Sequence, residues 1–313
     1  MDGVVIIDKP SGQTSHDVVA EVKRLLKARK AGHTGTLDPL ATGVLPVLLN
    51  EGTKLAPFLM NTSKEYQGTA LLGVCTDTLD VTGTVVSTNH LHVSEEDVIR
   101  SVRGLRGLRM QVPPLYSAIK FKGRPLHRWA RKGVTIIPEP REVEIFHAEV
   151  VAINLPEVIF TISCSKGTYI RSLCADIGEK LGCGATLASL RRTKNGSFSA
   201  GDALLLAGLD DDVRIKLLEA GIISTAEATS GLKTIHIDDL LADKIRKGCQ
   251  LMSDEVARDH ISFLDKGDMI RLLSPRAGLV AIMEVLTSGR EEAMHGDVRQ
   301  IAKTLRVFGS HHG

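Results

Sequence analysis

Cysteine is scarce in this sequence, and its spacing excludes two common roles. The five cysteines lie far apart, and no two of them form a Cys-x-x-Cys pair. An odd number at wide spacing argues against a disulfide framework and against a zinc site. We therefore expect most of these cysteines to be small buried apolar residues.

Long apolar runs and the usual phosphate-binding motifs are missing as well. No run approaches the roughly 18 apolar residues that a membrane-spanning helix needs. The opening MDGVVIIDKP places an acid before an apolar run of four residues, unlike a signal or transit peptide. Neither GxxxxGK[ST] nor GxGxxG after a strand is present. These absences predict a cytoplasmic protein without membrane contact.

The charge that is present is unevenly distributed. Residues 1–200 carry 25 Lys and Arg against 19 Asp and Glu, residues 201–231 carry 2 against 6, and residues 232–313 carry 12 of each. A first part with excess positive charge can attract a polyanion, although many enzymes share so mild a bias. A chain of 313 residues is long enough for roughly two domains.

Helices and strands alternate in the first 200 residues. Val4–Asp8 reads as a short strand, and an amphipathic helix follows behind Thr14 or Ser15 as N-cap. Two β-rich runs flank Leu155-Pro156 and predict a hairpin. After Lys166-Gly167, apolar residues at helical spacing from Ile170 to Leu181 predict a further helix that ends at Gly182.

The composition changes twice after this region. We expect a first domain over residues 1–208 and an acidic helical connector over residues 209–231. Short β-like runs separated by turn residues then predict a small β-barrel or sandwich over residues 232–313.

The stretch AGHTGTLDPLATG, residues 31–43, places a lone acid, Asp38, among glycines, threonines and small apolar residues. A metal site would need more ligands than His33 and Asp38. Judged by its local pattern, Asp38-Pro39 simply forms a turn, as Asp does routinely.

Four other stretches of the sequence give the Asp38 stretch a more specific interpretation. DKPSGQTSHD, KEY (Lys64–Tyr66), SKGTYIR (Ser165–Arg171) and LRR (Leu190–Arg192), read together with HTGTLDPLATGVLPV, resemble the bacterial TruB family of tRNA pseudouridine synthases. The resemblance covers residues 3 to about 200 and includes VPPLYSAIKFKGRPLHRWARKG, while the C-terminal zone resembles a PUA domain more weakly. It implies an α+β fold with a mixed, mostly antiparallel sheet and flanking helices, followed by a small PUA-like β-barrel.

The resemblance also implies a reaction. Such enzymes isomerise the T-loop uridine of tRNA, position 55 in standard tRNA numbering, to pseudouridine. They break the N1–C1′ bond, turn the base and rejoin it through C5, a redox-neutral change that needs no cofactor or metal. A carboxylate must assist loss of the base, by attacking the sugar or by acting as a base toward it, and the sequence leaves both routes open.

Residue roles follow from the same resemblance. Asp38 is the implied catalytic aspartate and Arg171 its cationic partner, which offsets the rise in carboxyl pKa that burial under substrate causes. Tyr66 would lie against the flipped uracil. Tyr169 and Arg171 would share one side of an extended chain, but would diverge by about 200° if the helix had already begun.

The remaining implied residues bind substrate or support the site. His33 resembles the histidine that inserts into the T-loop, and Leu190 would touch the base. Lys9 and Pro10 would support the Tyr66 region without doing chemistry.

A basic flap over about residues 112–141 holds the only tryptophan, Trp129. Between Ser117 and Gly133 the flap has no acid, which favours contact with phosphates over an ordinary solvated helix face. The flap residues that we expect to bind RNA are Lys120, Lys122, Arg124, Arg128 and Arg131.

The partner that these features predict is tRNA, at its T-arm and acceptor side. We expect a monomer with no obligate protein partner. Two alternatives stay open, a guide-RNA-dependent enzyme that works inside a ribonucleoprotein, and an RNA-binding or RNA-folding protein whose flap matters more than its chemistry.

Overall fold

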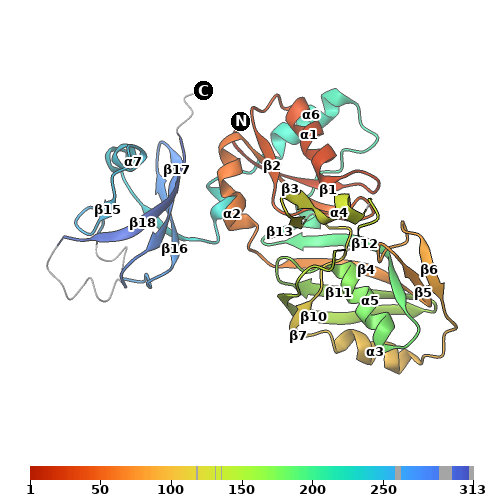
Figure 1. The fold of residues 1–313 in the computed structure, drawn as a ribbon. Coiled ribbons are helices and arrows are strands. Elements are labelled where there is room, and N and C mark those ends of the chain that lie inside the picture. The colour runs from red at the N-terminus through yellow and green to blue at the C-terminus, as the bar shows by residue number, and fades with distance from the viewer. Residues whose placement is uncertain (118, 131, 135, 258–261, 289–297, 310–313) are drawn as a thin grey trace.

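The chain forms a larger and a smaller body in the computed structural model (Figure 1). The structure describes residues 1–117, 119–130, 132–134, 136–257, 262–288 and 298–309. A nine-stranded sheet organises the larger body and a five-stranded sheet the smaller one. The second sheet begins at Lys233, close to the change in composition seen in the sequence.

The large sheet is mixed but mostly antiparallel, which confirms the expected fold class. Its main path is β1 (Gly3–Lys9), β3 (Thr42–Leu49), β12 (Ala185–Asn195), β4 (Lys64–Leu72), β11 (Glu157–Cys164), β10 (Arg141–Asn154) and β7 (Gly107–Gln111). Short strands β2 (Ala31–His33) and β13 (Phe198–Ser199) pair with β3 and β12. Among the described strand pairs of this sheet, only β3 and β12 run parallel.

Helix α1 (Ser15–Leu25) begins at a capping box. The Thr14 hydroxyl accepts a hydrogen bond from the backbone N–H of Asp17, and the Asp17 carboxylate accepts one from the N–H of Thr14. Of the two predicted caps, Thr14 is therefore the N-cap. The apolar residues of α1 recur at helical spacing and are buried against the sheet, as the sequence predicts.

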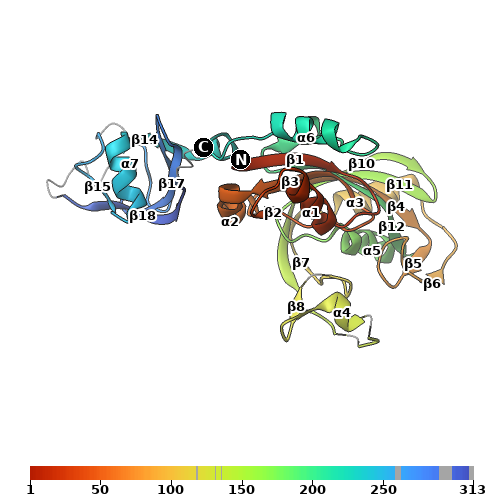
Figure 2. The same cartoon turned by 90° about the horizontal axis from the view of Figure 1, so that it is seen from above.

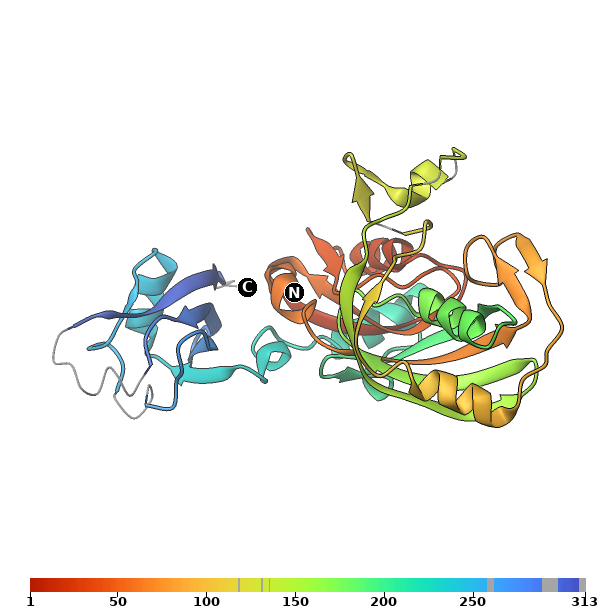
Figure 3. The same cartoon turned by 60° about the horizontal axis from the view of Figure 1, so that its bottom comes forward.

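Helices α3 (Glu95–Arg103) and α5 (Ile170–Lys180) lie on the same side of the large sheet (Figure 3). Helix α5 ends before Gly182, whose φ of 71° is the left-handed conformation that glycine adopts most easily. The predicted hairpin is confirmed, since β10 and β11 pair antiparallel and are joined through a cis Leu155-Pro156 bond.

Short elements complete the larger body. The strands β5 (Val74–Thr76) and β6 (Val85–Thr88) form a separate two-stranded hairpin, whose loop exchanges backbone hydrogen bonds with Leu187 of β12. The flap holds β8 (Lys120–Phe121), β9 (Arg124–Pro125) and α4 (Leu126–Ala130). The others are η1 (Asn50–Leu55), α2 (Ala56–Leu59) and η2 (Ala200–Asp202).

Residues 209–231 hold helix α6 (Asp211–Ala220) and the short η3 (Glu227–Thr229). Two ion pairs fasten α6 to α1, Arg24–Asp211 at 3.0 Å and Arg214–Glu21 at 2.7 Å. Beyond α6, Ile223 exchanges two backbone hydrogen bonds of 2.8 Å with Val4. This segment therefore packs along the larger body.

The smaller body is a curled, PUA-like sheet with its own apolar core. Its strand order is β14 (Lys233–His236), β16 (Met269–Ser274), β17 (Gly278–Val285), β18 (Gln300–Val307) and β15 (Leu251–Met252). Helix α7 (Asp239–Arg246) packs against β17. The β-rich small domain that the sequence predicts is thus observed.

A shared apolar cluster holds the two bodies together. Phe308 and Ile282 of the smaller body are buried with Val4, Leu48 and Leu55 of the larger one. The Lys54 ammonium donates to the Val307 carbonyl at 2.9 Å and lies 5.8 Å from the centre of the Phe308 ring. Within the described ranges, no helix has both the length and the apolar character needed to cross a membrane.

Candidate active site

The Asp38 loop connects β2 to β3 and is fixed by the start of α1. The buried Ser15 hydroxyl accepts a hydrogen bond from the Leu37 N–H at 2.7 Å and donates to the Leu37 carbonyl at 3.1 Å. The Pro39 carbonyl accepts a further one from the Gly12 N–H at 2.8 Å. The residues on both sides of Asp38 are therefore held in place, while its own side chain keeps 39% of its surface exposed.

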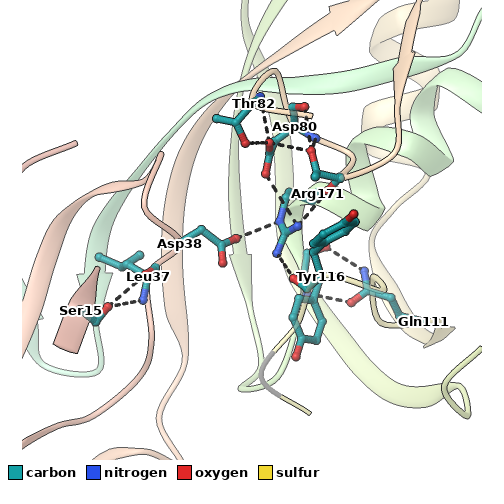
Figure 4. Close-up of polar contacts among 10 residues, drawn as sticks. Ser15, Leu37, Asp38, Asp80, Thr82, Gln111, Tyr116 and Arg171 are labelled. Atoms are coloured by element: carbon teal, nitrogen blue, oxygen red, sulfur yellow. Dashed lines mark hydrogen bonds and ion pairs between the residues drawn. The ribbon is translucent and has the colours of Figure 1, made fainter. Parts of the chain in front are cut away.

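Arg171 is the immediate partner of this carboxylate (Figure 4). Its Nε donates to Oδ2 of Asp38 at 2.9 Å, and only 4% of the arginine side chain is exposed. Nη1 donates to the Thr78 carbonyl at 2.8 Å, and Nη2 to the Tyr116 carbonyl at 2.9 Å. With each nitrogen of its planar fork engaged, the guanidinium holds Asp38 in one orientation.

A second acid, Asp80, lies on the other side of Arg171. Its Oδ2 is 3.7 Å from Nη1 of the arginine, and 7% of its side chain is exposed. The Thr78 hydroxyl and the Thr82 N–H donate to Oδ1 of Asp80 at 2.9 and 3.0 Å. Asp80 is not among the residues predicted from the sequence, although its setting among threonines in TDTLDVTG is similar to that of Asp38.

Tyr169 lies at the point where α5 begins. It is the N-cap residue with an extended backbone, φ −102° and ψ 109°, while Arg171 is already helical. Buried Gln111 fixes this point, because its side chain accepts from the Tyr169 N–H at 2.8 Å and donates to the Tyr169 carbonyl at 3.0 Å. The sequence leaves two alternatives, an extended chain through both Tyr169 and Arg171 or a helix that already includes both. The structure shows neither, because Tyr169 is extended and Arg171 is helical.

Burial raises the pKa of the Tyr169 phenol. The Asp38 charge raises it further and the Arg171 charge opposes this, so both groups lie within electrostatic reach of the ring. The Tyr169 phenol therefore senses the charges of both members of the Asp38–Arg171 pair.

Tyr66 and Leu190 are nearly buried and belong to the same apolar cluster as Leu37. Burial raises the pKa of Tyr66, whereas the charge of Arg192 and a hydrogen bond with its side chain lower it. The Leu190 carbonyl accepts a hydrogen bond from the Thr42 hydroxyl at 3.4 Å. The side chain of Leu190 is thus a core residue that lies beside the Asp38 loop.

His33 is half-buried at the end of β2, five positions before Asp38. Its Nδ1 accepts a hydrogen bond from the Gly35 N–H at 3.3 Å. Burial lowers the pKa of His33, and the charges of Arg192 and His16 lower it further. The neutral imidazole is therefore favoured at neutral pH.

Lys9 is fully buried and supports the Asp38 loop. Its ammonium donates to the carbonyls of Pro10, Gln13 and Pro39 at 2.8, 2.7 and 3.4 Å. Burial lowers the pKa of Lys9 to about 8. The family resemblance implies that Lys9 and Pro10 support the Tyr66 region, whereas the Lys9 hydrogen bond to Pro39 ties Lys9 to the segment that carries Asp38.

The basic flap stands out from the larger body (Figures 2 and 3). Its described cations Lys120, Lys122, Arg124 and Arg128 are exposed, and Arg131 lies outside the described residues. The Trp129 indole donates to the Phe121 carbonyl at 3.3 Å, and the two rings meet edge to face at 6.3 Å. The aromatic pair thus stabilises a flap whose charges point to solvent.

These residues combine an accessible carboxylate with a fixed cation and nearby aromatic rings. Such a site can act on a carbon centre by nucleophilic attack or by proton abstraction. In the part of the chain that the structure describes, no group of three or more His, Cys, Asp and Glu side chains is arranged to hold a metal ion.

Comparison with known proteins identifies the family. A family model described as TruB family pseudouridylate synthase, N-terminal domain, matches residues 23–170, and one described as tRNA pseudouridylate synthase B C-terminal domain matches residues 171–219. The tRNA pseudouridine synthase B of Syntrophus aciditrophicus is 44% identical over 98% of this chain and 99% of its own length. The tRNA pseudouridine synthase B of Geobacter sulfurreducens is 41% identical over 98% of this chain and 100% of its own length.

Solved structures agree with these sequence matches. The structure described as a Cbf5-Nop10-Gar1 complex has a TM-score of 0.75 and 29% identity, covering 98% of this chain and 85% of its own. One described as an H/ACA RNP bound to a substrate RNA containing 2'-deoxyuridine has a TM-score of 0.72 and 27% identity, with coverage of 98% and 85%. The chain belongs to the TruB family of pseudouridylate synthases.

Proposed function

We propose that this enzyme converts the T-loop uridine of tRNA, position 55, to pseudouridine, with Asp38 as the essential carboxylate. The observation that carries the proposal is the Asp38–Arg171 pair, in which a 39% exposed carboxylate receives a 2.9 Å hydrogen bond from an almost fully buried guanidinium. The names of its relatives support tRNA as the substrate.

Arg171 keeps Asp38 ionised and oriented when substrate displaces water from the site. Desolvation by a bound nucleotide favours the protonated carboxyl, and a guanidinium in contact opposes that shift. The ionised oxygen then acts on the ribose of the everted uridine, as a nucleophile at C1′ or as a base that starts an elimination. Either route releases the uracil, which turns and reattaches through C5.

The uracil turns between the aromatic side chains. Tyr66 provides a stacking face for the base, Leu190 limits the apolar side of the pocket, and Tyr169 borders Asp38 and Arg171. A stacked loop base costs a few kcal/mol to extrude, and His33 fills the space that the base leaves. A half-buried, neutral imidazole is suited to this role because it can stack without carrying a charge into the loop.

The flap and the PUA-like body bind the rest of the RNA. Exposed Lys120, Lys122, Arg124 and Arg128 clamp phosphates of the T-arm, and Arg131 of the same basic run extends this set. Residues 232–313, with equal numbers of acidic and basic side chains, make an accessory contact on the acceptor side.

The enzyme acts on free tRNA in the cytoplasm as a monomer without an obligate protein partner. Its relatives named tRNA pseudouridine synthase B reach 44% identity, against 29% for the structure solved with Nop10 and Gar1. The stand-alone branch of the family is therefore favoured over the branch that works within a ribonucleoprotein.

Tritium release tests the proposal. A tRNA transcript labelled at uridine C5 is incubated with the purified chain and with Asp38→Asn, without a guide RNA. We expect stoichiometric release at one uridine of the T-loop with the wild type, none with the variant, and similar tRNA affinity for both. Release by Asp38→Asn would refute the role of Asp38, and release only with a guide RNA would favour the other branch. If Asp38→Asn lost tRNA affinity and turnover equally, the role of Asp38 would not be confined to the chemical step.

A further inference from the structure

The candidate site is assembled across a narrow joint in the large sheet. Asp38 belongs to the β2–β3 segment, whereas Tyr66 and Leu190 lie on β4 and β12, and α5 packs on β12. The two parts of the sheet meet at a parallel pairing of only two residue pairs, Arg191 with Thr42 and Arg192 with Gly43. The distance between Asp38 and Tyr66 therefore depends on how this joint is held.

Arg192 crosses the joint with its side chain. Its Nε donates to the Val44 carbonyl at 2.7 Å, and its Nη2 donates to the Gly35 carbonyl at 3.1 Å. Both acceptors lie on the segment that carries Asp38, Gly35 only three positions before it. On the β4 side, Arg192 is the cross-strand partner of Tyr66, and its charge lowers the pKa of the Tyr66 phenol against the larger, opposing effect of burial. One residue thus donates hydrogen bonds to the backbone on both sides of Asp38 and lies opposite Tyr66 on the neighbouring strand.

The burial of this guanidinium is costly. Arg192 is 1% exposed, and no carboxylate of the described residues lies within ion-pair distance of it. A buried charge without a counter-ion is usually less stable than an apolar residue of similar size. Packing of the core alone therefore does not explain an arginine at this position.

The charge of Arg192 affects the pKa values of three groups near the Asp38 loop and Tyr66. Burial is the largest influence on the lowered pKa values of Lys9, His33 and Lys64, and the charge of Arg192 lowers each of them further. These three groups surround the Asp38 loop or adjoin Tyr66 along the chain.

We propose that Arg192 is a positioning residue, which sets the Tyr66 phenol and the Asp38 loop at a fixed distance across the joint. This inference rests on the proposed role of Asp38. Arg192 acts through Tyr66 and through the Gly35 carbonyl, and touches no reacting atom. Substrate binding by the flap does not depend on it.

The test compares Arg192→Met and Arg192→Lys with Arg191→Met as matched control. Arg191 crosses the same joint on the other face of β12, where it forms a bidentate ion pair with Asp8 at 2.9 and 2.7 Å. The readouts are the single-turnover rate constant with saturating enzyme, the tRNA affinity and the melting temperature. Saturating enzyme distinguishes a mispositioned site from partial unfolding. A partly unfolded sample loses reaction amplitude, whereas an enzyme with a mispositioned site reacts more slowly at full amplitude.

We expect Arg192→Met to react about 10²-fold more slowly at full amplitude and unchanged affinity, since small displacements of catalytic groups cost that much. Arg192→Lys should recover part of the rate. Arg191→Met should melt at a lower temperature and keep its rate constant. A wild-type rate for Arg192→Met, or an equal loss of rate in Arg191→Met, would overturn the proposal.

A double-mutant cycle keeps the proposal testable if Arg192→Met does not fold. The cycle combines Arg192→Lys with Tyr66→Phe, which removes the phenol hydroxyl of its cross-strand partner. Residues that act through one another are not additive, so the double variant should be faster than the product of the two single effects predicts. Full additivity would contradict the proposed link. If Asp38→Asn is active, the proposed function has failed. If Asp38→Asn is inactive and the cycle of Arg192→Lys with Tyr66→Phe is additive, only the positioning role of Arg192 has failed.

Discussion

Arg171 lies between Asp38 and Asp80, with its Nε 2.9 Å from an oxygen of the first and its Nη1 3.7 Å from an oxygen of the second. The arginine is buried, Asp80 is buried with it, and only Asp38 reaches solvent. One carboxylate thus helps to orient the guanidinium, and the guanidinium orients the exposed carboxylate of Asp38.

Replacing Arg171 by Lys should lower the single-turnover rate by about 10²-fold or more, because a lysine keeps the charge but cannot reproduce the planar fork. The binding of tRNA, measured by filter retention, should change little. Arg109→Lys is the control, since Arg109 lies on the terminal strand β7 of the sheet and forms a partly exposed ion pair with Asp176 at 3.0 Å. A rate loss of the same size in both variants would show that the fork geometry is not the cause.

Asp80→Asn should destabilise the protein by about 1–3 kcal/mol, the usual range for losing a charge-assisted hydrogen-bonding partner in a buried network. The amide can still accept from Thr82, so the fold should be retained and urea unfolding should report the difference. Asp77→Asn on the same loop is the control, because the Asp77 carboxylate receives its hydrogen bond from the Thr84 N–H in an exposed setting. Equal stability of both variants would contradict a structural role for Asp80.

The lowered pKa of Lys9 should make the free energy of unfolding depend on pH in the alkaline range. Its pKa is about 8 in the folded chain and near 10.5 when unfolded, so between these values the unfolded state binds more protons and folding becomes more favourable as pH rises. From pH 8 to 9, the wild type should gain about 1 kcal/mol relative to Lys9→Met. Urea unfolding at the two pH values measures the difference, and the comparison cancels the opposing titration of Cys164, whose pKa burial raises to about 11.

Lys64→Met provides a second measurement of the same kind, since burial lowers the pKa of Lys64 to about 8 as well. An identical pH slope for the wild type and both variants would mean that neither ammonium loses protons on folding in this range.

Gly43→Ala should destabilise the joint by about 3 kcal/mol or more, as overpacked sites do when the neighbour is backbone. Gly43 has a φ of 100°, and a Cβ there would lie 2.2 Å from the Arg192 carbonyl oxygen. Gly208→Ala is the matched control, because its φ of 77° imposes a similar backbone strain in open space. We expect a clearly smaller loss of unfolding free energy for Gly208→Ala, and equal losses would argue against close packing at the joint.

The flap should dominate the salt dependence of tRNA binding. Changing Lys120, Lys122, Arg124 and Arg128 together to Gln should lower the slope of log affinity against log salt by about 3, since each phosphate contact contributes about 0.7–0.9. The rate constant at saturating enzyme should stay close to that of the wild type. Lys216→Gln, an exposed change on α6, should leave the slope unaltered. An unchanged slope in the fourfold variant would exclude the flap from phosphate contact.

The sequence by itself determined the elements whose signals lie within a few residues. The start of the first helix at Thr14 or Ser15, the hairpin at Leu155-Pro156, the helix that ends before Gly182 and the β-rich C-terminal body could all be predicted from local patterns. The family resemblance placed Asp38 and Arg171 together before any geometry was known.

Only the tertiary structure decided the contacts between distant segments. Asp80 approaches Arg171 because the β5–β6 hairpin folds toward α5, Lys9 supports the Asp38 loop, and Arg192 crosses the joint between β3 and β12. Local propensity carries no signal for such pairings, since they depend on which strands become neighbours and how closely backbones approach. A buried cation among carbonyls is visible only once the chain around it is folded.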